Sequence, residues 1–116
     1  SNAMQRYLWQ QADGKRHVYD TARHRVQAGR PFTALCGETV TPQTERGDLT
    51  AGLWFDGECP VCTIALAKAL GWPVREISDL AHRFDWSPAL ITRLAEVLHC
   101  SFGEVVELTG ARMVDA

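Results

Sequence analysis

The chain has 116 residues, 46% of them hydrophobic, with four cysteines, four tryptophans and a formal net charge of −2. This length fits one ordinary domain or two very small ones, and the apolar content excludes an intrinsically disordered chain. No apolar run approaches the roughly 18 residues that a membrane span needs, and no signal peptide is apparent, so we expect a cytoplasmic protein without a membrane partner. Residues 1–3, which precede Met4, are interpreted as an expression-tag remnant and excluded from the fold.

Residues 4–62 are predicted to form a small β-rich half. The Asp13-Gly14 pair lies between two segments of aromatic and β-branched residues, which is typical of a β-hairpin over residues 6–20. After a polar connector, a second short strand runs into Cys36-Gly37. Residues 41–50 are polar and are expected to form an exposed loop.

Residues 63–116 have helical periodicity and are predicted to form a second module. It either packs on the first module or forms a dimer, because short apolar helices need a partner surface. Ser87-Pro88 is a typical N-cap followed by proline at the first helical position, and the spacing of Ser101 and Glu104 predicts a capping box. We expect three or four helices, with helical spacing over residues 64–70, 74–84, 88–98 and 101–109. The predicted fold class is therefore α+β, with a zinc-stapled β-rich half followed by a helical half.

The prediction of zinc depends on three cysteines and one histidine. Cys59 and Cys62 have the C-x2-C spacing that lets a tight turn aim two thiolates at one metal ion. Cys36 is a third candidate, because the glycine after it permits a backbone turn around a ligand. His17, in the second strand of the predicted hairpin, is favoured as the fourth ligand, and His24 in the polar connector is the alternative. Four protein ligands leave no position for water, so we expect one structural zinc ion per chain.

The cysteines and tryptophans allow other interpretations. A C-x2-C pair before a helix can be a redox dithiol, but a thioredoxin-like fold needs a preceding βαβ unit, which the sequence lacks. Cys100, between two predicted helices, is expected to be a small buried hydrophobic residue. The tryptophans are interpreted as core residues: Trp9, Trp54, Trp72 and Trp86.

The order RHVYD…ALCGETV…W…ECPVC resembles the small zinc-finger proteins of actinobacteria. Their pattern is a histidine, a Leu-Cys-Gly step after a short strand, and a final Cys-Pro-x-Cys. The resemblance covers about residues 9–63. It implies that His17, Cys36, Cys59 and Cys62 are the metal ligands.

The segment ITRLAEVLHCSFGEVVELTG resembles the closing helices of Cro/repressor-type helix-turn-helix domains. The resemblance implies a DNA-binding regulator, for which the local excess of positive charge would supply phosphate contacts through Lys15, Arg16, Arg23, Arg25 and Arg30. Against it, the helices are rich in carboxylates, which phosphates repel.

The sequence contains no glycine-rich phosphate loop, no H-E-x-x-H and no G-x-S-x-G motif, so we expect no enzymatic activity, and no small-molecule substrate is identified. The favoured function is a zinc-stabilised binding or regulatory module that acts through a protein partner or as a dimer.

Overall fold

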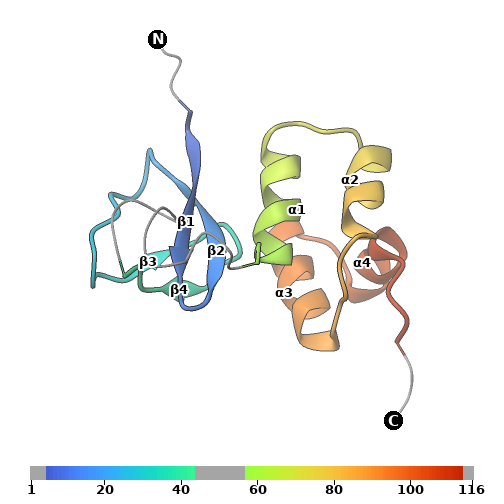
Figure 1. Cartoon of the computed structure of the whole chain (residues 1–116). Coiled ribbons are helices and arrows are strands. Elements are labelled where there is room, and N and C mark those ends of the chain that lie inside the picture. Colours follow the sequence, from blue (N-terminus) through green and yellow to red (C-terminus); the bar gives the residue numbers. More distant parts are fainter. Residues whose placement is uncertain (1–4, 44–56, 114–116) are drawn as a thin grey trace.

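The fold was analysed in a computed structural model, which describes residues 5–43 and 57–113. The tag remnant, most of the predicted 41–50 loop and Trp54 lie outside these ranges. Two small antiparallel sheets occupy the N-terminal half and four helices the C-terminal half (Figure 1), so the predicted α+β class is confirmed.

The first sheet is the predicted hairpin. Strands β1 (Tyr7–Ala12) and β2 (Lys15–Asp20) pair antiparallel, with Gln10 opposite His17. The turn between them has positive φ at both central residues, Asp13 (53°) and Gly14 (82°), as a two-residue hairpin requires. The second sheet consists of β3 (Phe32–Thr33) and β4 (Thr39–Val40), each only two residues long.

The helices are α1 (Pro60–Ala69), α2 (Val74–Ala81), α3 (Pro88–Leu98) and α4 (Phe102–Thr109). Ser87 caps α3 by accepting a hydrogen bond from the Leu90 N–H, with Pro88 at the first helical position. The predicted capping box at the start of α4 is present: Ser101 and Glu104 each accept the backbone N–H of the other. Local sequence signals therefore set where α3 and α4 begin.

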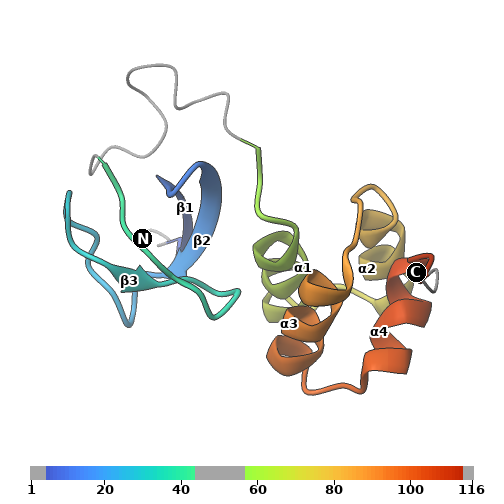
Figure 2. The ribbon, with the colours of Figure 1, turned by 90° about the horizontal axis from the view of Figure 1, so that it is seen from below.

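The helices pack as a compact group beside the sheets. Helix α1 contacts α2 and α3, and α4 contacts the same two helices (Figures 1 and 2). The buried apolar side chains form one cluster that runs from Val18 and Val40 in the sheets through Ile64 in α1 to Ile91 in α3. The expected division between residues 62 and 63 falls in the first turn of α1, within this shared core.

Helix α1 also joins the two halves through the backbone just before it. The Arg16 N–H donates to the Gly57 carbonyl and the Cys59 N–H donates to the Arg16 carbonyl, both at 2.9 Å, so residues 57–59 lie along β2. An ion pair between Glu38, beside β4, and Arg93 of α3 adds a second link between the halves. Among the described residues, no helix is both long and apolar enough to cross a membrane.

Two predictions about burial were wrong. Cys100 is exposed, because it lies in the turn between α3 and α4, immediately after the left-handed His99 that ends α3. Trp72 is 44% exposed in the turn between α1 and α2, whereas Trp86 is buried and donates its indole N–H to the Ala81 carbonyl at 2.8 Å. Helical spacing alone did not indicate which turns the core covers.

Candidate metal centre

Three separate segments bring four donor side chains to one point. His17 comes from the middle of β2, Cys36 from the turn between β3 and β4, and Cys59 and Cys62 from the start of α1. One ligand atom from each side chain lies within 4.8 Å of all the others, and all four residues are buried. The favoured four residues, with His17 as the histidine, therefore form one group in the structure.

The turn that carries Cys36 is held by backbone hydrogen bonds. Ala34 donates to the Glu38 carbonyl and Gly37 donates to the Ala34 carbonyl, each at 2.9 Å. Gly37 has a φ of 86°, a conformation that glycine adopts without a side-chain clash. The Leu35 N–H donates to the Val18 carbonyl at 2.8 Å, which fixes the turn beside the strand that carries His17.

The other two thiols are positioned by the beginning of α1. Cys59 is the N-cap residue, and its sulfur accepts the Cys62 N–H at 3.4 Å. Pro60 has no N–H to satisfy and a fixed φ, so it suits the first helical position. One turn of helix therefore sets the spacing of the two sulfurs, while the hydrogen bond from Cys59 to Arg16 places them beside His17.

The distances fit a tetrahedral zinc ion. The His17 Nδ1 atom lies 3.7 Å from the Sγ atoms of both Cys36 and Cys62. A tetrahedral ion with Zn–S of about 2.3 Å and Zn–N of about 2.0–2.1 Å separates sulfur and nitrogen ligands by about 3.6 Å. Three thiolates and one imidazole are also a typical donor set of structural zinc sites. The four residues thus form a zinc-binding group.

The group has strongly perturbed acid–base behaviour. Burial disfavours the imidazolium form of His17, but hydrogen bonds with the thiols of Cys36 and Cys59 outweigh it and raise the pKa of His17 to about 9. Hydrogen bonds from Cys36 and Cys62 lower the pKa of Cys59, whereas the pKa of Cys62 is raised by its hydrogen bonds with Cys36 and Cys59. Zinc requires thiolates and a neutral imidazole, so its uptake by this group would release protons.

The alternative ligand is not part of the group. The ring of His24 lies against Phe32, with ring centroids 6.5 Å apart, and His24 is absent from the set of donors that converge. The redox interpretation finds no structural support either, because both described sheets are antiparallel and no parallel βαβ unit precedes Cys59 in the described residues.

The basic residues proposed for phosphate contacts are dispersed. Lys15 lies at the start of β2, whereas Arg23 follows its end, and six strand residues at roughly 3.3 Å each separate these points by about 17 Å. Arg16 is partly buried, with its guanidinium 3.8 Å from the Glu58 carboxylate. The exposed members of the set are Lys15, Arg23, Arg25 and Arg30.

Sequence analysis missed two features around the site. The Val18 carbonyl lies 3.9 Å from the Cys62 sulfur and also accepts the Leu35 N–H, and a backbone contact of this kind leaves no sequence signal. The ion pair between Glu38 and Arg93, which lies next to the Cys36 turn, joins residues distant in sequence and was equally invisible.

The fold and the site together define a small α+β zinc-finger protein. The model of the zinc-finger family named for one histidine and three cysteines matches residues 7–73, more than half of the chain, and the protein belongs to this family. The match includes all four donor residues and extends through α1.

The chain is also similar to a solved structure. A crystal structure of a mutant form of an uncharacterized protein from Saccharomonospora viridis is 99% identical, with a TM-score of 0.86 over 96% of this chain and 100% of that one. The resemblance to small actinobacterial zinc-finger proteins is thereby confirmed. No curated protein matches the chain.

Proposed function

We propose that this protein is a non-enzymatic binding or regulatory module, stabilised by one structural zinc ion per chain, that acts through a protein partner or as a dimer. The observation that carries the proposal is a set of large apolar side chains exposed on the helical half. They are Leu70 (58% exposed), Trp72 (44%), Val74 (72%) and Phe102 (42%). Exposed aromatic and aliphatic groups of this size are typical of surfaces that bind other proteins.

The geometry of the metal centre supports a structural role for zinc. Four protein ligands complete a tetrahedral shell, so a bound zinc ion would have no open position for water or substrate. The ligands are also buried, with Cys36 and Cys62 fully inaccessible to solvent and His17 only 2% exposed. Such a centre holds segments together, and its binding energy contributes directly to folding.

The charge distribution favours a protein partner over DNA. Carboxylates are exposed along the helical half, at Glu76, Asp79, Asp85, Glu96, Glu104 and Glu107. A duplex that approached these helices would meet this negative charge, and the exposed basic residues are divided between two ends of the β-rich half.

Solution behaviour separates the two functions. We would measure the mass of the full chain by sedimentation over a wide concentration range, and its binding to a labelled random DNA duplex at several salt concentrations. The proposal predicts no DNA binding at physiological salt, together with self-association that salt barely affects or, for a monomer, binding of protein partners through the apolar residues. DNA affinity that falls steeply with salt and is lost when Arg23 and Arg25 are replaced by alanine would contradict the proposal.

A further inference from the structure

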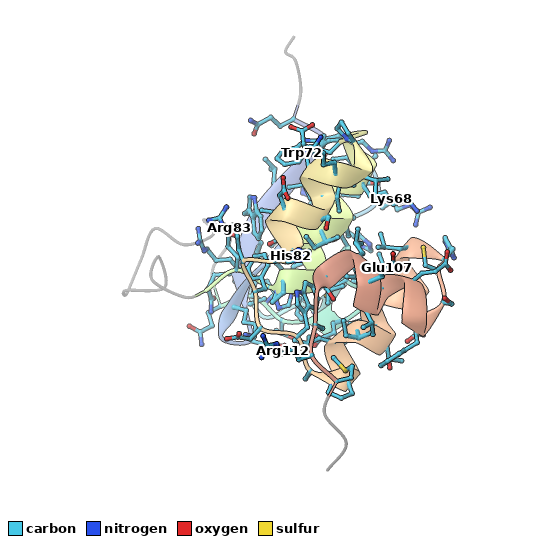
Figure 3. All side chains as sticks on the ribbon, turned by 90° about the vertical axis from the view of Figure 1, so that its right-hand side faces the viewer. Lys68, Trp72, His82, Arg83, Glu107 and Arg112 are labelled. Carbon is cyan, nitrogen blue, oxygen red and sulfur yellow. The ribbon has the colours of Figure 1, made fainter. Side chains whose placement is uncertain are left out.

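We propose that the face around Trp72 binds a protein segment that carries an apolar anchor next to a lysine or arginine side chain. This inference rests on the proposed function and deepens it, because it specifies the chemistry of the partner. It depends on two hollows that share Trp72, one apolar and one acidic. Figure 3 shows this side of the molecule, where Trp72 lies at one end with Lys68, Glu107 and Arg83 around it.

The first hollow, with a volume of about 440 Å³, lies where the α1–α2 turn faces α4. Most of its lining is apolar, from Trp72, Val74, Ile77, Leu98, Val105 and Leu108. Two charged residues also line it, and both are engaged within the chain. Lys68 donates to the Leu98 carbonyl at 3.0 Å, and Glu104 accepts the Ser101 N–H at 2.9 Å. The space therefore suits an aliphatic or aromatic side chain.

The second hollow, of about 310 Å³, lies along α2 on the other side of Trp72. Its lining includes the carboxylates of Glu76 and Asp79 and the guanidinium of Arg83. Glu76 and Asp79 are three residues apart on one exposed helix face, and among the described residues no ion pair joins either to a cation. This hollow therefore carries excess negative charge that a partner can neutralise.

The two hollows together specify the occupant. An apolar side chain in the first hollow places its neighbours over the exposed ring of Trp72, and a basic neighbour gains both a cation–π contact and the carboxylates beyond it. A central aromatic residue that contacts both groups is a typical binding hot spot. A second copy of this chain is disfavoured, because a two-fold contact through this face would bring Glu76 and Asp79 close to the same carboxylates of its partner.

Selection from a random peptide library tests the inference. A displayed library of 15-residue peptides would be selected on the zinc-loaded full chain, and enriched peptides would be synthesised and titrated by fluorescence anisotropy. The variants are Trp72→Ala, Glu76→Lys and, as a matched charge reversal, Asp85→Lys, which changes an exposed carboxylate outside both hollows. Zinc content and circular dichroism of each variant would verify that the fold is kept.

The enriched peptides are expected to combine an apolar residue with a lysine or arginine. Their affinity should fall about tenfold or more for Trp72→Ala, as for a hot spot, and about fivefold for Glu76→Lys, with little change for Asp85→Lys. Acidic or uncharged peptides that need Trp72 but tolerate Glu76→Lys would overturn the inference and leave the proposed function standing. If no peptide is enriched, if peptides bind Trp72→Ala normally, or if this face only mediates self-association, the inference is also overturned. The proposed function fails with it only where Trp72→Ala alters neither peptide binding nor self-association.

Discussion

Cys59 has two structural roles at once. Its sulfur is one of the four zinc-binding donors, and it also caps α1 by accepting the Cys62 N–H. The position at a helix N-terminus favours a thiolate, because the helix dipole and the free N–H groups stabilise negative charge there. A serine at this position could keep the cap but would be a poor zinc ligand, so replacement separates the two roles.

Gly110 is a second residue with a specific requirement, and it yields a stability prediction. Its φ is +67°, and a Cβ atom built on it would lie 2.3 Å from the Nε2 atom of His82. Gly110→Ala is therefore expected to lower the free energy of unfolding by about 2 kcal/mol, because it adds backbone strain and displaces the His82 ring. Urea denaturation of the zinc-loaded protein would measure this change.

Gly103, within the first turn of α4, is the matched control. A Cβ atom there would meet nothing within 4 Å, so Gly103→Ala should leave stability unchanged or raise it by up to about 1 kcal/mol. Equal effects of the two substitutions would contradict the account of Gly110.

The helices of the C-terminal half are defined mainly by their ends. Helix α4 has only eight residues, and a helix of this length is unstable in isolation. Its capping box satisfies two backbone N–H groups that would otherwise lack partners. We therefore expect Ser101→Ala to cost about 1 kcal/mol of stability.

Thermal unfolding of the zinc-loaded protein would measure this cost, with Ser101→Asp as the control, because aspartate also caps helices well. A Ser101→Ala variant as stable as the wild type would show that packing alone holds α4.

At the scale of elements, the sequence predicted what depends on local chemistry. The Asp13-Gly14 hairpin, the Ser87 cap and the Ser101 capping box are all in place, because each needs only neighbouring residues. Helix α1 begins earlier than the predicted spacing, at Pro60, because the apolar period is obscured where Cys59 and Cys62 face a metal centre.

The convergence of the four donors was predictable because C-x2-C and Cys-Gly motifs have few other uses. The exposure of Trp72 and Cys100 was not predictable from local chemistry. It depends on which helix packs over each turn, and helical periodicity does not contain that information.

At the scale of the whole molecule, the metal centre and the helical core are continuous. Helix α1 supplies Cys62 to the zinc-binding group on one side and packs against α3 on the other. We therefore expect the two halves to unfold together. Removal of zinc with a chelator should lower the unfolding temperature of both, since free zinc a thousandfold above its dissociation constant stabilises a folded chain by about 4 kcal/mol.

Two spectroscopic signals would follow the halves in parallel. Helical circular dichroism reports on α1 to α4, and a histidine resonance of His24 reports on the β-rich half. Coincident transitions that shift together on chelation are expected. A helical transition that stays unchanged after zinc removal would show that the helices fold independently.

The most direct test of the account is the zinc content of the purified full chain and of two variants, measured by elemental analysis. The account predicts one zinc ion per wild-type chain, loss of tightly bound zinc in His17→Ala, and full retention in His24→Ala, because only His17 lies among the three thiols. Wild-type protein without zinc, or zinc lost in His24→Ala and retained in His17→Ala, would contradict it.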